Sequence, residues 1–316
     1  MIIQAMTHDV TLIEQLDGVA RLSSMGVIKV DGADAASFLQ GQLTQDFVLL
    51  KSADARLAAF CSAKGRMQAS FVGFKQSDTE ILLLCSLDVL PATLKRLSMF
   101  VMRAKARLTD ASGEFSVFGL AGTAARNLGL SVDTPWLAAT VGTGTAISLY
   151  PAITVVRALW VGPKGDTPPA GIPLSEALWA WSEVQSGIAT INAKTADAFV
   201  PQMLNYESVG GVNFKKGCYP GQEVVARSQF RGSLKRRAYI VHSEAHMAAG
   251  DEVFASTDAD QPCGTVAQAA ASPAGGFDAI ASMQVAAAAA GGLTLRSASG
   301  PTLHLQPLPY ALLEDI

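Results

Sequence analysis

A lone cysteine in a cationic turn is the position in this sequence best suited to carry out chemistry. Cys218 follows Lys215 and Lys216, and it precedes a turn at residues 219–221 and a stretch of helical composition at 222–227. Proline and glycine exclude a helix through the turn, so the helix must begin after it. Neighbouring cations and a helix N-terminus favour the thiolate over the thiol. The pattern predicts a reactive or ligating thiol at Cys218, with Lys216 favouring its ionised form.

The same residue type also allows an inert interpretation. Free cysteines are among the most buried residues, and most of them act as small hydrophobic side chains. We predict that role for Cys61, Cys85 and Cys263. Cys218 differs because its neighbours are polar, cationic and turn-forming. Spacing alone leaves both interpretations open for it.

The composition limits the kind of protein. The 316 residues are 49% hydrophobic and 16% charged, with a net charge of −3. This predicts a compact protein of two domains, without a general attraction to nucleic acid or membranes. Scattered cysteines and histidines argue against disulfides and a metal site. The first 14 residues do not resemble a signal peptide, and the uncharged stretches 134–156 and 279–295 are broken by glycine or proline. We therefore expect a cytoplasmic protein without a membrane span.

A strand, a turn and a short helix recur in the first two thirds of the chain, at residues 27–43 and 115–130. Hydrophobic patterning then predicts antiparallel strands and a helix after each copy. The expected strands are 56–61, 67–75, 80–85 and 104–108, then 146–150 and 154–161, and the helices are 87–99 and 174–186. The repetition predicts an α+β fold with duplicated α/β repeats, at about 20–112 and 113–232, within a domain spanning 1–232.

The pattern changes after Gly232. Short strands separated by Gly, Pro, Asp and Ser are expected at 237–242, 252–255, 265–269, 279–285 and 302–306. Strands of this length and spacing are typical of a small β-barrel or sandwich. We therefore place a second domain at residues 233–316, with the boundary at Gly232-Ser233.

Three segments together form a family signature: residues 199–227 with the motif KGCYxGQE at 216–223, residues 32–46, and the turn Lys64-Gly65-Arg66-Met67. They resemble the YgfZ-type folate-binding proteins, which are linked to iron–sulfur cluster assembly or repair. These are distantly related to the glycine-cleavage T-protein, an aminomethyltransferase. The resemblance covers most of residues 20–240. It implies intertwined α/β repeats that bind tetrahydrofolate or a derivative, a C-terminal β-barrel, and iron–sulfur proteins or assembly factors as partners.

Two departures from the aminomethyltransferases bear on the activity. The resemblance places a catalytic aspartate in the hairpin at residues 63–70, where this chain has no carboxylate. Without that acid we expect no aminomethyl transfer. The transferases also hold the pterin with the glutamate of an Arg-x-Glu-x-Gly stretch, and the matching position here is Gln185. An amide can pair with a pterin edge but carries no charge, so we expect weaker folate binding.

The sequence therefore predicts a folate cleft with Gln185 near the pterin and Cys218 at the rim. Cys218 would act as a nucleophile, a redox group or a transient iron ligand. The residues expected to act with the thiol are Lys216, Glu223 and Arg227. Those expected to contact the folate are Gln185, Trp181, Lys64, Arg66, Tyr219, Gln222 and Arg231.

Two other functions remain open. The basic residues at 227–237, with Lys215 and Lys216, could form a solvated face, an anion site for the glutamate tail of a folate, or a contact with tRNA. The last would make the protein a tRNA-modification factor. The enzymatic alternative is a folate-dependent one-carbon transferase, against which the missing hairpin aspartate argues.

Overall fold

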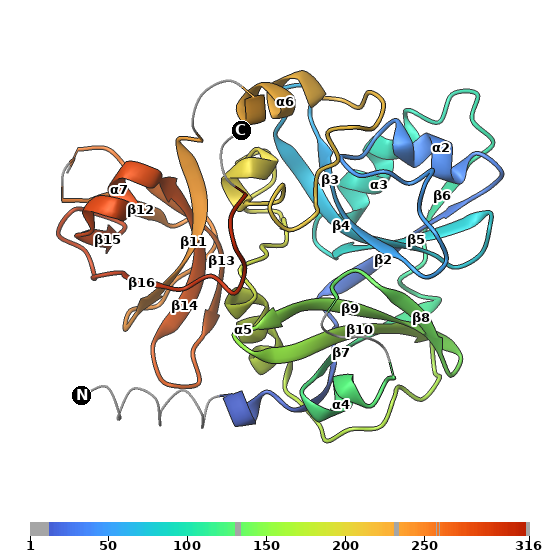
Figure 1. The fold of residues 1–316 in the computed structure, drawn as a ribbon, viewed down its shortest axis with the longest axis horizontal. Coiled ribbons are helices and arrows are strands. Elements are labelled where there is room, and N and C mark those ends of the chain that lie inside the picture. Colours follow the sequence, from blue (N-terminus) through green and yellow to red (C-terminus); the bar gives the residue numbers. More distant parts are fainter. Residues whose placement is uncertain (1–12, 130–133, 231–233, 257, 259, 314–316) are drawn as a thin grey trace.

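Three antiparallel β-sheets organise the chain in the computed structural model, which describes residues 13–129, 134–230, 234–256, 258 and 260–313 (Figure 1). Two five-stranded sheets lie on one side of the molecule and a six-stranded sheet lies on the other. Helix α5 (Glu176–Gln185) lies between them. Within the described residues, no helix is long and apolar enough to cross a bilayer.

The first sheet has the strand order β3-β4-β5-β2-β6. Its strands are β2 (Met25–Asp31), β3 (Ala55–Cys61), β4 (Met67–Lys75), β5 (Glu80–Ser86) and β6 (Arg107–Asp110). One face packs on α2 (Ala35–Gln40) and α3 (Leu90–Ser98), and the other belongs to a core shared with the second sheet. Because both faces are covered, β3 and β5 are apolar at almost every position.

The second sheet has the order β1-β7-β10-β9-β8. Its strands are β1 (Gly18–Arg21), β7 (Phe115–Ala121), β8 (Ala138–Val141), β9 (Gly144–Ala152) and β10 (Val155–Pro163). Helix α4 (Thr123–Arg126) packs on it through small alanines. The helix expected at 122–130 is thus much shorter than predicted, and residue 130 lies outside the described residues.

The two five-stranded sheets exchange their outer strands. Strand β1 directly precedes β2 in the chain but pairs with β7, and β6 directly precedes β7 but pairs with β2. The other strands have the same order in both sheets, β3-β4-β5-β2 in one and β8-β9-β10-β7 in the other. Neither sheet is complete without a strand from the other half of the chain.

The third sheet has the order β15-β12-β13-β14-β11-β16. Its strands are β11 (Arg236–Ser243), β12 (Glu252–Ala255), β13 (Gly264–Ala271), β14 (Phe277–Gln284), β15 (Leu293–Leu295) and β16 (His304–Gln306). Residues 301–303 bond to β15 while β16 pairs with β11, so one segment contacts both ends of the sheet. The strand expected at 279–285 ends at Gln284, because the following alanine-rich run forms α7 (Val285–Ala290). The expected boundary at Gly232-Ser233 lies outside the described residues.

A buried carboxylate fastens α5 to the third sheet. Asp278 on β14 is 2% exposed and accepts hydrogen bonds from Trp181 Nε1 at 2.6 Å and Gln185 Nε2 at 2.9 Å. His242 Nδ1 lies 2.8 Å from the same carboxylate, and Gln306 Nε2 donates to it at 3.3 Å. A buried carboxylate needs several such partners to offset its lost hydration. The contacts join α5, β11, β14 and β16 at one point.

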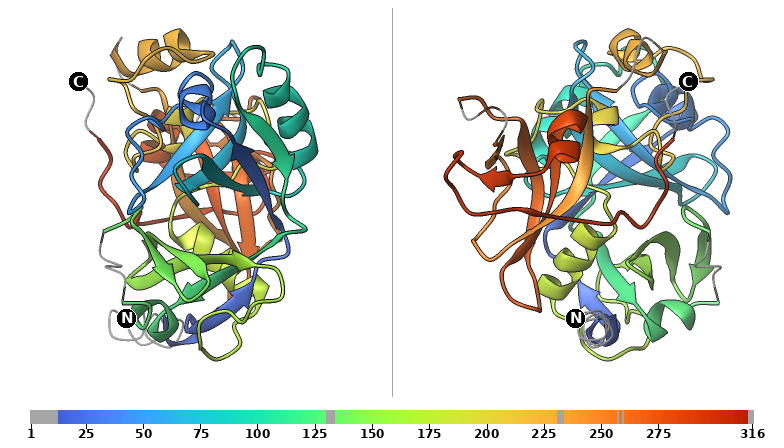
Figure 2. Two further views of the ribbon diagram at one scale, coloured as in Figure 1. Left: turned by 90° about the vertical axis from the view of Figure 1, so that its right-hand side faces the viewer. Right: turned by 60° about the vertical axis from the view of Figure 1, so that its left-hand side comes forward.

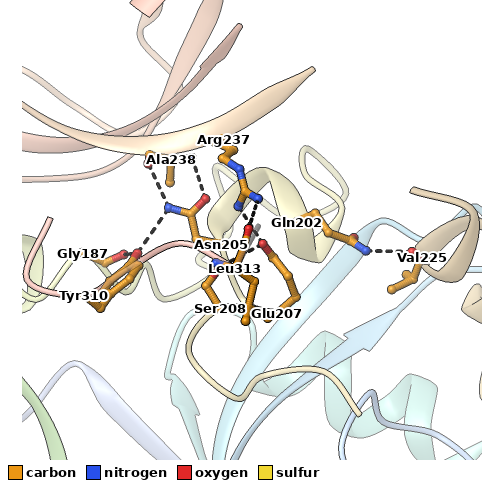
Figure 3. Close-up of polar contacts among 10 residues, drawn as sticks. All are labelled: Gly187, Gln202, Asn205, Glu207, Ser208, Val225, Arg237, Ala238, Tyr310 and Leu313. Atoms are coloured by element: carbon orange, nitrogen blue, oxygen red, sulfur yellow. Dashed lines mark hydrogen bonds and ion pairs between the residues drawn. The ribbon is translucent and has the colours of Figure 1, made fainter. Parts of the chain in front are cut away.

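Residues 307–313, which we call the strap, cross from the third sheet to the other two, as the red segment in Figures 1 and 2 shows. Tyr310 Oη donates to the carbonyl of Gly187 at 2.8 Å. The backbone of Leu313 donates to Ser208 Oγ at 3.0 Å and accepts from Arg237 Nη2 at 2.8 Å (Figure 3). The strap therefore connects β11 to the segment that follows α5.

Arg237 and Glu207 form an ion pair beside the strap (Figure 3). Arg237 Nη1 lies 2.7 Å from Glu207 Oε1, and the side chains are only 8% and 0% exposed. Burial raises the pKa of Glu207, and the bond from Arg237 opposes that effect. Such a pair contributes little net stability, but removing one partner leaves the other as an uncompensated buried charge.

We expect Glu207→Leu to lower the free energy of unfolding by about 3–5 kcal/mol, because it removes the buried carboxylate that pairs with the Arg237 guanidinium. Adding Arg237→Met should recover much of the loss, which urea denaturation measures. Glu114→Leu, in the exposed pair with Lys29 (53% and 23% exposed), serves as the control and should cost less than about 1 kcal/mol. If Glu207→Leu lowers the free energy of unfolding equally in the wild-type and the Arg237→Met backgrounds, this account is wrong.

Candidate functional site

The motif at 216–223 is a loop docked on the hairpin turn between β3 and β4. Gly221 has φ of 80°, and a Cβ there would lie 2.4 Å from Ser62 O and 2.7 Å from Gly65 Cα. Gly65 has φ of 70°, and its Cβ would lie 2.9 Å from Val224 Cβ. Only glycine combines this backbone with so close an approach. The KGCYxGQE motif and the Lys64–Met67 turn are therefore one structural unit.

Cys218 lies exposed in this loop, and all three other cysteines are buried. Burial raises the pKa of Cys61 and of Cys85 to about 12, so these thiols stay protonated. Helix α6 (Gln222–Phe230) begins only after the turn that follows Cys218. The thiol is therefore accessible, but it lies before the helix rather than in its first turn.

Lys216 anchors the loop to the turn after α2. Its Nζ donates to Gln40 O at 2.5 Å and to Leu43 O at 2.8 Å, and lies 4.6 Å above the ring of Tyr219. Burial lowers the pKa of Lys216 to about 8, which the negative charges of Asp46 and an ionised Cys218 oppose. The ammonium is thus held by backbone carbonyls of another segment.

The remaining motif residues divide between the interior and the surface. Tyr219 is buried, and burial raises the pKa of its phenol. Glu223 and Arg227 are exposed on α6, and Gln222 is partly exposed. Arg231 lies outside the described residues.

The hairpin residues lie beside this loop. Lys64 is exposed at the turn, and Arg66 Nη1 donates to the carbonyl of Ala198. Gln68 Nε2 donates to the exposed carboxylate of Asp197 at 3.1 Å. The hairpin therefore borders one carboxylate from another segment, although Asp197 is not among the residues that line the cavity described next.

A separate cavity lies between the first and second sheets, near the end of α5. It measures about 60 Å³, enough for a few water molecules, and its walls are mostly apolar and aromatic side chains from β3, β4, β5, β9 and β10. The two charged side chains among its described lining residues are Arg157 and Glu183. Neither Cys218 nor Lys216 lines it.

Glu183 carries the carboxylate of the cavity. Burial raises its pKa, whereas the positive charge of Arg157 and the neighbouring Trp179 and Gln268 lower it. Gln268 Nε2, on β13, donates to Glu183 Oε2 at 3.3 Å. Because Gln268 Oε1 also accepts from Thr190 N at 2.9 Å, this amide fixes the glutamate from the third sheet.

The two α5 residues predicted to bind the pterin face away from the cavity. Trp181 and Gln185 both donate to Asp278, and neither lines the cavity. Side chains two positions apart on a helix point about 200° apart, so Glu183 and Gln185 cannot share a face. A signal for Glu183 was present, since it is an acid that follows the apolar run at residues 177–181, with Trp179 four residues before it.

Trp136 separates the cavity from a second pocket of about 410 Å³ at the surface and lines both. Its φ of 66° is left-handed, its indole N–H donates to Val209 O at 2.9 Å, and its ring lies 5.9 Å from that of Tyr150. The surface pocket is also lined by Asp46 and Asn213, from the segments next to the Lys216 anchor. Trp136 thus lines both spaces, and the surface pocket also borders the segments next to the motif loop.

Comparison with known proteins decides the family. A model described as the GCVT N-terminal domain matches residues 3–157. The tRNA-modifying protein YgfZ of Edwardsiella ictaluri is 31% identical over 309 residues, covering 92% of both chains. The protein of the same name from Sodalis glossinidius is 30% identical over 308 residues, again covering 92% of both. The chain belongs to the YgfZ family.

This YgfZ-family chain also shares its fold with a transferase. The glycine cleavage system aminomethyltransferase T from Bartonella henselae matches with a TM-score of 0.67 at 14% identity, over 95% of this chain and 89% of the other. The family resemblance and the mixed α and β content predicted from the sequence are therefore confirmed. Among the described residues, no group of three or more His, Cys, Asp or Glu side chains is arranged to hold a metal ion.

We expect Lys216→Met to lower the free energy of unfolding by about 1–3 kcal/mol, because two buried carbonyls lose a charged donor. Chemical denaturation measures the change. Lys215→Met removes an exposed neighbour of equal size and should have almost no effect. If the two variants lose equal stability, Lys216 is not the anchor.

The same two variants also test how the free energy of unfolding depends on pH. The Lys216 pKa falls from 10.5 to about 8 on folding, so between these values the unfolded chain binds more protons than the folded chain. The Lys216 contribution to stability therefore increases as the pH is raised through this window. Wild type and Lys215→Met should show this increase, and Lys216→Met should lack it.

Proposed function

We propose that this protein binds tetrahydrofolate, or a derivative of it, in the cavity between the first two sheets. The observation that carries the proposal is Glu183, a carboxylate held against a mostly apolar, aromatic-lined cavity. A pterin ring is flat and presents adjacent N–H donors, which a carboxylate can accept in pairs. Glu183 takes the role that the sequence suggested for Gln185.

The size of the cavity sets a condition on this binding. About 60 Å³ is too little for a bicyclic ring, so part of the wall has to move aside. The pair Trp136 and Tyr150 is the candidate, because Trp136 lines both the cavity and the surface pocket and its ring lies against that of Tyr150. The folate tail would then extend through the surface pocket toward the motif loop.

We interpret the two five-stranded sheets as the intertwined repeats of a folate-binding domain. Their exchanged outer strands and equal strand order support this interpretation. The third sheet is then the C-terminal β-barrel domain, supported by the segment 301–306 that contacts both of its ends.

We further propose that Cys218 is the functional thiol of a cytoplasmic accessory protein for the assembly or repair of iron–sulfur enzymes. Its exposure, beside a buried lysine and among three inert cysteines, supports a role in contact with other molecules. It would act as a nucleophile, a redox group or a transient iron ligand. Iron–sulfur proteins or their assembly factors would be the partners.

A one-carbon transferase is less well supported. The hairpin at 63–70 contains no carboxylate, and Asp197, the carboxylate bonded to Gln68, is exposed outside the cavity. A transfer reaction needs its acid or base within hydrogen-bond reach of the reacting atom. We therefore propose that the chain is a binding protein rather than an aminomethyltransferase.

A tRNA-related role is a second candidate, because the relatives from Edwardsiella and Sodalis are named tRNA-modifying proteins. The basic stretch supports it only in part. Arg237 is buried in its pair with Glu207, and Arg236 Nη1 donates to Cys263 O at 2.9 Å. Lys215, Arg227 and Lys235 remain exposed for contact with phosphates.

We expect Glu183→Gln to weaken tetrahydrofolate binding about 10- to 100-fold, because a neutral amide replaces a charged acceptor. Calorimetric titration measures the affinity. In wild type the affinity should fall as acid protonates Glu183, at a higher pH than an ordinary glutamate would show. That pH dependence should be absent from the variant. Gln185→Met is the matched control on the other face of α5; if it abolishes binding while Glu183→Gln does not, the assignment is wrong.

We expect Cys218→Ala to bind tetrahydrofolate normally but to leave iron–sulfur enzyme activity unrestored in cells that lack the protein. Cys263→Ala, which removes a buried thiol, should restore the activity and serves as the control. Enzyme assays in complemented cells, together with titration of the purified variants, separate the two properties. Full restoration by Cys218→Ala would rule out the thiol proposal.

A further inference from the structure

Arg157 is a buried cation whose Nε has no hydrogen-bond partner within the part of the chain that the structure describes. The residue is 3% exposed and lines the cavity. Its Nε is fully buried and has no acceptor among the described residues. Its contact is with the ring of Trp179, whose centroid lies 4.4 Å from Cζ. A buried donor without an acceptor is costly, so the site is incomplete as it stands.

The strand geometry aims this side chain at the cavity. The register between β9 and β10 shifts just before Arg157, since Val155 pairs with Ala152 but Arg157 pairs with Leu149. The extra residue lies on β9, in the segment that contains Tyr150. Such bulges re-aim side chains and occur next to binding sites. Here both Tyr150 and Arg157 line the cavity.

Arg157 and Glu183 line the same cavity. The described structure shows no ion pair between them, yet the charge of each alters the titration of the other. A guanidinium offers only donors and an ionised carboxylate only acceptors. A ligand that binds both residues in the cavity must therefore present donors to Glu183 and an acceptor to Arg157.

We propose that Arg157 is a specificity-determining residue, which selects ligands with a ring carbonyl beside their N–H donors. The inference rests on the proposed folate site, where Glu183 accepts the N–H edge of the pterin and Arg157 donates to its C4 oxygen. A 4-amino pteridine, in which an amino group replaces that oxygen and N3 carries no hydrogen, offers a donor where Arg157 needs an acceptor and one donor fewer to Glu183. Such a mismatch leaves a buried donor unpaired, which is the most effective basis for rejecting an analogue.

The test compares tetrahydrofolate with its 4-amino counterpart by calorimetric titration. Wild type should prefer the 4-oxo ligand by about 10-fold or more. Arg157→Met should lose most of the preference, whereas Arg157→Lys, which keeps a donor, should lose less of it. Arg107→Met, which removes an exposed arginine on β6 that lines neither the cavity nor the surface pocket, should leave the preference unchanged.

The stability of the free protein separates a ligand-binding role from a structural one. Arg157→Met removes a buried charge with an unpaired Nε and keeps an apolar stem against Trp179, so the free variant should melt no lower than wild type. A large drop in melting temperature overturns the inference, because it shows that the arginine supports the fold. Equal wild-type affinities for both ligands, or an unchanged preference in Arg157→Met, also overturn it. If neither ligand binds wild type, the proposed folate site itself fails.

Discussion

The carboxylate of Asp278 fixes how α5 lies between the sheets, and much of the candidate site depends on α5. Two donors on one side of the helix, Trp181 and Gln185, are held by this group on the third sheet. The helix rotation is thereby set, and Glu183 is turned into the cavity, where Gln268 of the same sheet contacts it. The third sheet contributes no charged side chain to the cavity, yet it determines which residues of α5 reach it.

The sequence predicted best the elements whose limits are marked locally. Strands β4 and β12 have the bounds expected from apolar runs between turn residues. Helix α7 was missed because no turn residue separates the end of β14 from the alanine run. The site was predicted only in part. The motif spacing identified the α5 segment but not its rotation, and nothing near Lys216 indicates that its ammonium is held by the distant turn after α2.

One strand connects the region of the exposed thiol to the cavity. Strand β4 starts at the hairpin turn on which the motif loop is docked, and its residues Ser70, Phe71 and Val72 line the cavity. Interior β-strands are closely packed and rigid, so a displacement at one end of β4 is transmitted to the other end. The glycines at 65 and 221 thus do more than shape a loop, because they hold the thiol at a fixed position relative to the cavity.

The strap has a consequence for the order in which the molecule is assembled. Nascent chains generally fold domain by domain from the N-terminus. Here residues 307–313 are synthesised after all three sheets, yet they bond to Gly187 and Ser208 beside the first two. Until they arrive, the pair of Arg237 and Glu207 is open to water on the side that the strap covers. The half of the molecule built from the first two sheets therefore matures late, when the ribosome has already made everything else described here.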